Sequence, residues 1–463
     1  MTNAGPPPVA DWTTTLPEAA STNAVAIDKF ALTSAVSLLA STATTPANYD
    51  LRDAGANRLF GDADDVVYAV APAFDSNTVL TFTIANGPLQ PGRVRFSTKA
   101  TLLDQNSNPL EVFTREFTIA NPVLGQIENT DNNVLEGATP LVLTETPAGS
   151  GFSTVLAAGS FSTGTDSDYW RLHGEAGDHL ALLLETDDWE NWPYVAILNA
   201  SGGGIAGSWN YYPNAGINDF VLPASGTFYL QAYSSRGRPA RYQLRVDISR
   251  GPQFESEAND APSSANALNL TTSAGNYQAR VAGALTGGDT AGDYFRIPTL
   301  NVGNTIRVQL ALPSCSTLNK SNVVISVERE GSSEALAASN SGALNYVVAV
   351  DGVHFVRITA DANLGLRALY LADIQVTDGQ PPVITASSWP EEGTTNTGLW
   401  QVFSLSFSED LAAGTVNDGA NYELRSAGAD GVFGTGDDQL YQVQCAPVYS
   451  SGLSASYWVP DGP

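Results

Sequence analysis

The chain reads ANYDLRDAGA at residues 47–56 and ANYELRSAGA at residues 420–429. Around this stretch, residues 17–68 align without a gap on residues 390–441, and 22 of the 52 aligned positions are identical. Chance alone would give about three identities. The match predicts that the 463-residue chain begins and ends with the same kind of folded module. We call these modules the first and second outer modules.

A second, weaker repeat lies between the outer modules, at a spacing of about 126 residues. Asp168-Tyr169-Trp170 corresponds to Asp293-Tyr294-Phe295. The chain therefore contains two inner modules as well, and segments rich in Pro and Gly separate the four. We place the modules at residues 1–122, 127–248, 253–378 and 380–463.

Short segments of β-branched and aromatic residues occur throughout the chain, and turn residues bound them. Examples are Val79–Ile84, Leu180–Leu184, Tyr242–Val246 and Val323–Val327. Helical periodicity is scarce. Because antiparallel sheets that bury one face stack in pairs, we predict an all-β chain of tandem β-sandwich modules, immunoglobulin-like and jelly-roll-like.

The composition excludes several classes of partner. Asp and Glu number 48 against 21 Lys and Arg, and the net charge of -27 repels nucleic-acid phosphates and anionic bilayers. We therefore expect no nucleic-acid partner. No run of 18 apolar residues occurs, so no membrane insertion is expected. The only two cysteines, Cys315 and Cys445, are expected to be idle thiols, with one long-range disulfide as the alternative.

The alignment of the outer modules also predicts how the last one ends. After a two-residue insertion, Gly87-Pro88 falls on Gly462-Pro463, whereas the first copy continues beyond that point. We therefore expect the second outer module to be cut short, with Val443 and Tyr457 partly uncovered. No signal segment is visible at the start, and we expect that this is not the native N-terminus.

The inner modules share a set of spaced motifs. The second has Glu255-x-Glu257-x-Asn259-Asp260, then Gly283, then Asp293-Tyr294-Phe295. The first has Glu128, Asn132, Gly159 and Asp168-Tyr169-Trp170, but Thr130 and Asn133 replace the second Glu and the Asp. Through these residues each inner module resembles the bacterial pre-peptidase C-terminal domain, a β-sandwich related to the collagen-binding domains of clostridial collagenases.

The outer modules carry a Phe-x-Leu strand, an Asn-Tyr-x-Leu strand and, in the second copy, the turn Ser408-Glu409-Asp410. In these features they resemble the bacterial immunoglobulin-like domains of surface-layer and adhesin proteins. Such arrays are typical of large exported bacterial proteins. The resemblance implies an extracellular or cell-surface location.

Oxygen-bearing side chains gather in two segments of the second inner module. They are Glu255, Glu257, Asn259 and Asp260 in the lead segment, and Asp289 and Asp293 before a predicted strand. Calcium prefers six to eight oxygen ligands of these types. The resembled collagen-binding domains place a calcium site between the same two segments, so the resemblance implies calcium here, with Thr286 or Thr290 as a neutral ligand. The alternative is that the lead segment caps a linker turn and Asp293 starts a strand.

Two further acidic groups are weaker calcium candidates. The first inner module offers Glu128, Asn132, Asp166 and Asp168. The second outer module offers Asp430, Asp437 and Asp438 in a glycine-rich hairpin. Because Asp and Gly are also the residues that tight turns need, a plain turn is the alternative there.

Aromatic residues concentrate in one part of the first inner module. They are Trp189, Trp192, Tyr194, Trp209, Tyr211 and Tyr212. Rings beside carboxylates can stack on a sugar face or on a proline of a peptide. This indicates a binding patch for an extracellular polysaccharide or protein polymer, and a core ring with half-exposed loops is the alternative.

No catalytic motif is present. The sequence has neither a His-Glu-x-x-His helix nor a Gly-x-Ser-x-Gly elbow, and we expect that the chain is not an enzyme. We interpret it as a non-catalytic modular fragment of a large exported bacterial protein, with calcium-stabilised spacer and weak binding modules. The alternative is the accessory substrate-binding region of a secreted protease or glycoside hydrolase whose catalytic domain lies outside this chain.

Overall fold

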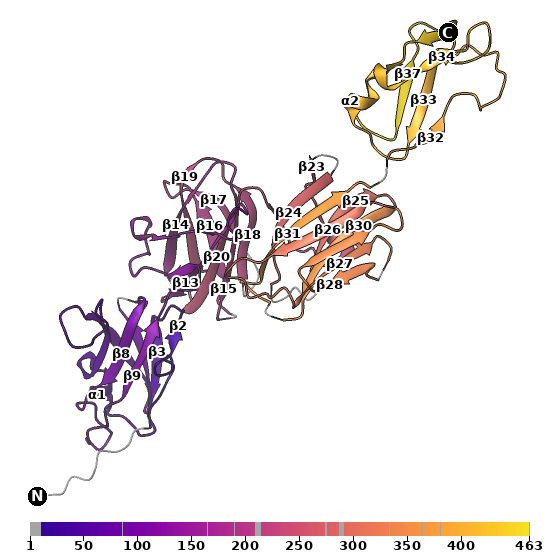
Figure 1. The fold of residues 1–463 in the computed structure, drawn as a ribbon. Coiled ribbons are helices and arrows are strands. Elements are labelled where there is room, and N and C mark those ends of the chain that lie inside the picture. The colour runs from indigo at the N-terminus through magenta and orange to yellow at the C-terminus, as the bar shows by residue number, and fades with distance from the viewer. Residues whose placement is uncertain are drawn as a thin grey trace, which may run out of the picture. The chain divides into compact units, whose positions relative to one another are not determined.

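The computed structural model describes residues 11–85, 87–163, 165–188, 190–208, 214–273, 276–286, 291–332, 334–362, 364–379 and 381–462. These residues form β-sheets with a few single helical turns, which confirms the all-β prediction (Figure 1). They divide into two compact units. One holds the described residues of 1–301 and 305–377, and the other those of 302–304 and 378–463.

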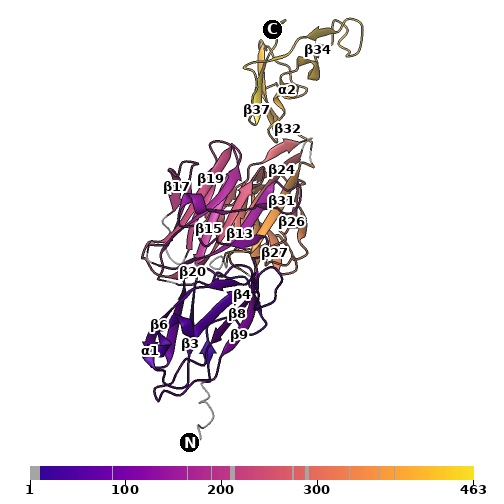
Figure 2. The ribbon, with the colours of Figure 1, turned by 90° about the vertical axis from the view of Figure 1, so that its left-hand side faces the viewer.

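The first outer module is a sandwich of two sheets, with β3 in one layer and β4, β8 and β9 in the other (Figure 2). All strand pairs are antiparallel except β2 with β9, which is parallel. The strand orders are β1-β3-β7-β6 and β2-β9-β8-β4-β5. Alternate residues of each strand face the core, where the rings of Phe30 and Phe82 stack at 4.7 Å. The elements are β1 (Thr13–Thr14), β2 (Thr22–Asn23), β3 (Lys29–Thr33), α1 (Ala40–Ala43), η1 (Pro46–Asn48), β4 (Tyr49–Asp53), β5 (Val66–Tyr68), β6 (Val70–Ser76), β7 (Val79–Ile84), β8 (Gly92–Thr98) and β9 (Thr114–Ile119).

The second outer module repeats this arrangement. Its α2, η4 and β35 lie 373 residues after α1, η1 and β5, and its sheet β32-β33-β37-β36 corresponds to β1-β3-β7-β6. The pair β34-β35 corresponds to β4-β5, and residues 381–462 contain no counterpart of β8 and β9. The elements are β32 (Ile384–Ser387), β33 (Val402–Phe407), α2 (Ala413–Val416), η4 (Gly419–Asn421), β34 (Leu424–Ser426), β35 (Gln439–Tyr441), β36 (Gln444–Cys445) and β37 (Ser454–Trp458).

The expectation that Val443 and Tyr457 are partly uncovered is wrong. Both side chains are buried. The ring of Tyr457 stacks on Phe403 at 5.1 Å and meets the edge of Tyr422 at 4.8 Å. Its hydroxyl lies 2.8 Å from that of Tyr422. The aromatic cluster therefore closes the core locally, without the strands that cover the first copy.

The inner modules are two copies of one sandwich. The sheets β10-β13-β20-β15-β18 and β11-β14-β19-β16-β17 of the first correspond strand for strand to β21-β24-β31-β26-β29 and β22-β25-β30-β27-β28 of the second. In each sandwich two short leading strands each pair in parallel with a longer strand. The parallel pairs are β10-β13 and β11-β14 in the first module and β21-β24 and β22-β25 in the second. The other pairs are antiparallel, such as β13-β20 and β24-β31.

The strands of the first inner module are β10 (Gly125–Ile127), β11 (Thr139–Pro140), β12 (Thr144–Glu145), β13 (Phe152–Phe161), β14 (Ser167–Gly174), β15 (His179–Thr186), β16 (Pro193–Leu198), β17 (Gly204–Ser208), β18 (Asn214–Val221), β19 (Gly226–Ser234) and β20 (Ala240–Ser249), with η2 (Leu135–Gly137). Those of the second are β21 (Gln253–Phe254), β22 (Asn266–Ala267), β23 (Thr271–Ser273), β24 (Asn276–Ala284), β25 (Asp293–Leu300), β26 (Thr305–Ala311), β27 (Val323–Arg329), β28 (Ala337–Ser339), β29 (Ala343–Val347), β30 (Gly352–Ala360) and β31 (Leu369–Thr377), with η3 (Pro262–Ser264).

The two inner modules pack against each other through a shared apolar cluster. Phe152 and Ala181 of the first lie in one cluster with Phe254, Leu369 and Leu371 of the second. Polar contacts flank it, such as the 2.9 Å hydrogen bond from the Ser314 amide to Thr146 Oγ1. The inner modules are therefore one packed pair. Cys315 is buried in the same cluster, and both cysteines are free thiols.

Candidate metal centre

The lead segment of the second inner module, residues 255–260, is positioned by β21. Because β21 pairs in parallel with β24 at Val281 and Ala282, Glu255 is brought to the end of β24. The Glu255 amide donates to the carbonyl of Ala282 at 3.0 Å, and the Ala284 amide donates to Glu255 Oε1 at 2.5 Å. The backbone therefore fixes the direction of this carboxylate.

Tyr370 on β31 joins the lead segment to the opposite sheet. Its hydroxyl donates to Glu255 Oε2 at 3.1 Å and also hydrogen-bonds Asp293 Oδ2 at the start of β25. Burial, together with the charges of these two carboxylates, raises the pKa of Tyr370 well above its usual value, so the phenol keeps its proton. Tyr370 pairs in register with Gly283, where an added Cβ would lie 2.3 Å from the phenol ring. Glycine is therefore required there.

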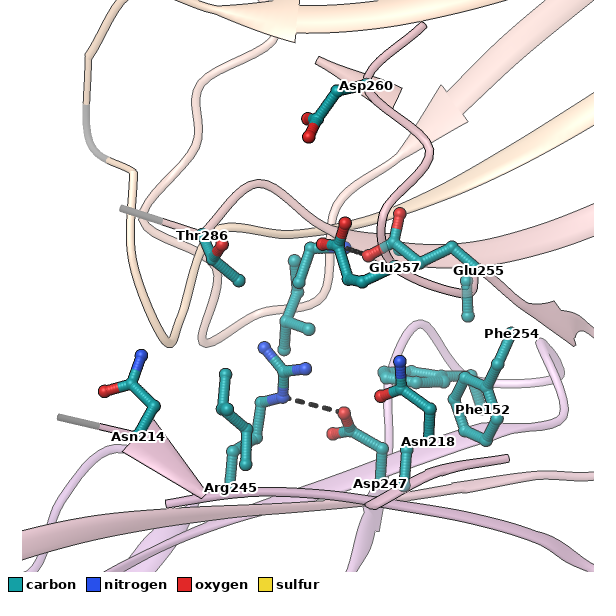
Figure 3. A pocket seen from close by; sticks show the side chains of 16 residues that line it. Phe152, Asn214, Asn218, Arg245, Asp247, Phe254, Glu255, Glu257, Asp260 and Thr286 are labelled. Carbon is teal, nitrogen blue, oxygen red and sulfur yellow. Dashed lines mark hydrogen bonds and ion pairs between the residues drawn. The ribbon is translucent and has the colours of Figure 1, made fainter. Parts of the chain in front are cut away.

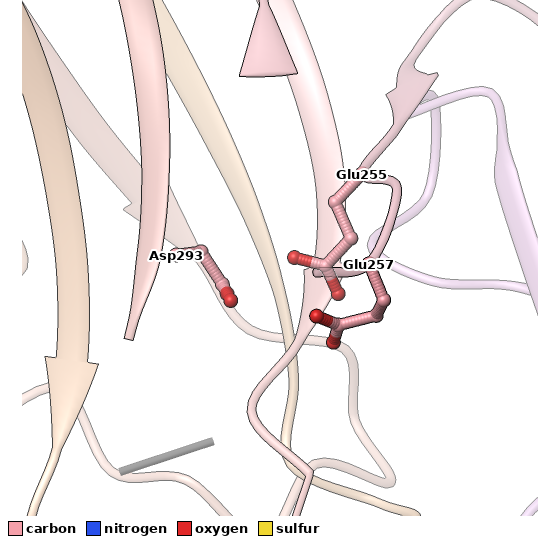
Figure 4. Close-up of side chains that lie close together, drawn as sticks. All are labelled: Glu255, Glu257 and Asp293. Carbon is pink, nitrogen blue, oxygen red and sulfur yellow. The ribbon is translucent and has the colours of Figure 1, made fainter. Parts of the chain in front are cut away.

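Glu255, Glu257 and Asp293 converge on one point (Figure 4). Each offers one carboxylate oxygen, and these three oxygens lie within 4.8 Å of one another. Two oxygens bound to the same calcium ion at about 2.3 to 2.6 Å are at most about 5 Å apart, so each pair of these oxygens is close enough to share one ion. In the part of the chain that the structure describes, no other group of three acidic, histidine or cysteine side chains is this close.

Asn259 adds a neutral oxygen to the lead segment. Its side chain is fully buried, and its Oδ1 has no hydrogen-bond partner within the described residues, although its Nδ2 donates to Asn266. Its carbonyl accepts from the amide of Tyr294, the residue after Asp293. A buried amide oxygen without a donor costs free energy unless a cation or water binds it. The residues present therefore fit a hard cation.

The remaining predicted ligands of this centre are less well placed. Asp260 and Thr286 line the same cavity as Glu255 and Glu257, but Asp260 stands apart from the acidic group (Figure 3). Asp289 and Thr290 lie outside the described residues. Calcium at this centre stays a prediction, and the three converging carboxylates are the observation that supports it.

The equivalent centre of the first inner module has two carboxyl groups instead of three. Glu128 and Asp168 are both buried, and the position of Glu257 is taken by the exposed Thr130. The Ser160 amide and hydroxyl donate to Glu128 Oε1 at 2.9 and 2.8 Å, and Asn132 Nδ2 donates to Oε2 at 3.3 Å.

The electrostatics of this first centre favour a bound proton. Burial raises the pKa of Glu128 to about 8, and burial together with the charge of Glu128 raises that of Asp168 well above its usual range. Asp166 accepts from the amide and hydroxyl of Ser162 at 2.5 and 2.7 Å. Calcium at Glu128, Asn132, Asp166 and Asp168 stays a prediction, and the geometry favours it less than in the second inner module.

The acidic hairpin of the second outer module is tied to its own backbone. Asp437 Oδ2 accepts from the amides of Ala429 and Asp430 at 2.7 and 3.1 Å. Asp438 Oδ2 accepts from the Gly434 amide at 2.7 Å and from Arg425 at 3.0 Å. The hydroxyl of Thr435, which donates to Asp437 Oδ1 at 2.7 Å, and the amides of Asp430 and Ala429 lower the pKa of Asp437. The Gly434 amide and Arg425 lower that of Asp438. Because Asp430 likewise accepts from the Val432 amide at 2.8 Å, the contacts are those of a tight turn, and calcium here stays a prediction.

Of the six predicted ligand-binding aromatics, the structure describes two. Trp192 is 48% exposed and lies under the guanidinium of Arg236, with Cζ 3.7 Å from the ring centroid. Tyr194 packs on Tyr233 with ring centroids 4.8 Å apart. The other four predicted rings, Trp189, Trp209, Tyr211 and Tyr212, lie outside the described residues, so the patch stays a prediction.

Sequence reasoning missed Tyr370, and it placed Gly283 in the shared motif without assigning it to the centre. Both recur in the first inner module, where an added Cβ at Gly159 would lie 2.2 Å from the ring of Tyr242. The Tyr242 hydroxyl lies 3.5 Å from Glu128 Oε2. A Gly and a Tyr kept at the same places in both copies were the signal that could have identified them.

No known protein family and no curated protein matches the chain. Among solved structures, domains 1–6 of the surface layer protein SbsC are 14% identical over 96% of this chain and 62% of that one, with a TM-score of 0.17. The M60 catalytic domain with the CBM51-1 and CBM51-2 domains from Clostridium perfringens ZmpB is 10% identical over 81% of this chain and 56% of that one, with a TM-score of 0.16. PcoC, a copper resistance protein from Escherichia coli, is 17% identical over 24% of this chain and 100% of that one, with a TM-score of 0.19.

These structures include domains of a surface layer protein, and at such TM-scores the similarity establishes neither family nor activity. Across the described residues, no helix has the length and apolar character needed to cross a membrane.

Proposed function

We propose that the chain is a non-catalytic modular segment of an exported bacterial protein, whose β-sandwiches act as calcium-stabilised spacers and weak binding modules at the cell surface or outside the cell. The observation that carries the proposal is the convergence of Glu255, Glu257 and Asp293 within 4.8 Å, with the buried Asn259 in the same lead segment as the two glutamates. Three carboxylates this close repel one another, and a divalent cation relieves the repulsion.

The position of the centre explains why a cation would stabilise a spacer. Glu255 and Glu257 belong to the lead segment, whereas Asp293 belongs to β25 in the body of the sandwich. A cation that bonds to both parts ties the start of the module to its sheets. Calcium suits this role better than magnesium, because it accepts irregular oxygen shells and releases its waters more readily.

The test is thermal unfolding of the full chain in calcium and in EDTA, followed by calorimetry. A ligand that binds only the folded state adds about 2.7 kcal/mol at a hundredfold excess over its Kd, which corresponds to a rise on the order of 5 °C. The transition of the unit that contains the inner modules should move, and that of the unit from residue 378 onward should not. Magnesium should produce a smaller shift.

The variant that tests the ligands is Glu257→Gln with Asp293→Asn. It removes two charges and keeps the shapes, so we expect the calcium shift to disappear while stability in EDTA changes little. The matched control is Glu330→Gln with Asp361→Asn, which removes two exposed acids of the same module and should keep the full shift. Equal melting temperatures in calcium and EDTA for the unaltered chain would refute the proposal.

A further inference from the structure

A cavity of about 280 Å³ lies between the two inner modules, next to the acidic centre (Figure 3). The first inner module contributes one wall, from β15, β18 and β20, and the second contributes the other, from the lead segment and the end of β24. Both walls belong to the same compact unit. The cavity therefore exists only because the modules are paired.

One wall carries a buried ion pair with an unsatisfied atom. Asp247 and Arg245 lie on β20 with side chains 3% and 12% exposed, and Arg245 Nε is 2.8 Å from Asp247 Oδ2. Arg245 Nη1 also donates to the carbonyl of Leu366 in the second inner module at 2.7 Å. Asp247 Oδ1 is buried and has no hydrogen-bond partner in the described part of the chain. A ligand hydroxyl that donates to this oxygen would remove that cost.

The other polar groups of the cavity are suited to neighbouring hydroxyls. Asn214 and Asn218 on β18 each present one donor group and one acceptor in a plane. Glu257 and Thr286 provide further oxygens on the opposite wall. The amide side chains of Asn214 and Asn218 can each bind two adjacent hydroxyls of a sugar ring.

The apolar part of the cavity matches the remaining surface of a sugar. Phe152 and Phe254 line it, and their rings meet edge to face at 6.3 Å. Aromatic walls bind the C–H face of a ring while polar groups bind its edge. A volume of about 280 Å³ lies at the small end of ligand pockets, which favours a single ring over an extended chain.

The charges of the cavity select against anionic ligands. Asp247, Glu255, Glu257 and Asp260 outnumber the single guanidinium of Arg245, so a carboxylate or phosphate is repelled. A neutral polyhydroxylated ring is not repelled.

We infer that this cavity binds one neutral pyranose ring, as the end or side branch of an extracellular polysaccharide. The inference goes beyond the proposed function, because the hydrogen-bonding groups on β18 and β20 need no bound cation.

The test uses saturation-transfer NMR on the full chain with glucose, galactose, mannose and N-acetylglucosamine, each in calcium and in EDTA. At least one of these sugars should receive saturation from the protein. Asn218→Ala should weaken that binding at least fivefold; the residue is exposed at the cavity, so the fold should tolerate the change. The control is Asn345→Ala, an exposed asparagine on β29, the strand equivalent to β18 in the second inner module, and it should leave binding unchanged.

Three results would overturn the inference: no binding of any of the four sugars, equal loss in Asn218→Ala and Asn345→Ala, or binding of N-acetyl-lysine amide in their place. The EDTA arm separates this inference from the calcium proposal. Sugar binding that persists in EDTA supports the cavity even if calcium gives no thermal shift. Sugar binding in calcium alone would also overturn the inference, because the hydrogen-bonding groups on β18 and β20 need no bound cation.

Discussion

The buried carboxyl pair of the first inner module predicts that this module loses stability as the pH rises. Glu128 and Asp168 are 2% and 1% exposed, and burial raises the pKa of Glu128 to about 8. In an unfolded chain a glutamate carboxyl has a pKa of about 4.3. Between these values the folded module therefore holds a proton that the unfolded chain has released.

The sign and size of the effect follow from proton linkage. Where the folded state binds one proton more than the unfolded state, the free energy of unfolding falls by about 1.4 kcal/mol per pH unit. Between pH 5 and pH 7.5 the loss is at most about 3 kcal/mol for one proton. The stabilisation is complete below about pH 4 and is lost as the pH passes through the folded pKa near 8.

The perturbation that tests this reasoning is Glu128→Gln. The amide is neutral at every pH, so the variant should lose the contribution of Glu128 and keep only the smaller pH dependence due to burial of Asp168. Hydrogen exchange measured by mass spectrometry reads each module separately, with peptides from β14 and β19 reporting on the first inner module and peptides from β25 and β30 serving as reference. After correction for intrinsic exchange, protection of the first set should fall by up to about 100-fold between pH 5 and pH 7.5.

The control keeps the carboxyl and changes its neighbour. Ser160→Ala removes the hydroxyl that donates to Glu128 at 2.8 Å and copies Ala284 of the second inner module, so its slope with pH should remain. Two results would refute the prediction that Glu128 and Asp168 hold a proton. One is protection of β14 and β19 that stays constant from pH 5 to pH 7.5 in the unaltered chain. The other is a pH dependence in Glu128→Gln equal to that of the unaltered chain.

Two further predictions concern the same scaffold. Gly283→Ala places a Cβ 2.3 Å from the ring of Tyr370 and 2.6 Å from Glu255 Oε2, so it should cost about 1 to 3 kcal/mol in denaturant unfolding; Gly414→Ala, whose Cβ meets nothing within 4 Å, should cost far less. Thr130→Glu with Asn133→Asp restores the lead-segment acids to the first inner module, and hydrogen exchange of β13 and β14 should then become slower in calcium than in EDTA. No calcium effect in that variant would show that the scaffold of the first module cannot hold the ion.

The fold class could be predicted from the sequence because the residues that repeat are mainly those that face the cores of the sandwiches. Phe30 and Leu32 on β3 recur as Phe403 and Leu405 on β33. In both copies these residues face the core of their module. Even the single helical turns α1 and α2 recur at the same offset, although no periodicity marks a helix of 4 residues.

The candidate site was only partly predictable, because its contacts depend on sheet register. Glu255 and Glu257 are neighbours in sequence, and Asp293 was found by resemblance. Tyr370 lies 77 residues after Asp293, and only the pairing of β31 with β24 brings its hydroxyl to both carboxylates. The cavity was invisible for a similar reason, since Asp247 and Glu257 face each other only when two sandwiches pack through Phe152 and Phe254.

The two inner modules show how one scaffold solves the same electrostatic problem in two ways. Each places a Glu from a parallel leading strand beside an Asp at the start of a strand, under a tyrosine that fits over a glycine. Two buried carboxyls can share this space if one is protonated, and in the first module the donors Ser160 and Asn132 only partly offset the effect of burial on the pKa of Glu128. A third carboxylate at Glu257, within 4.8 Å of the others, adds a charge that one proton cannot neutralise. We therefore expect the change between Thr130 and Glu257 to convert a site that favours a proton into one that favours a divalent cation.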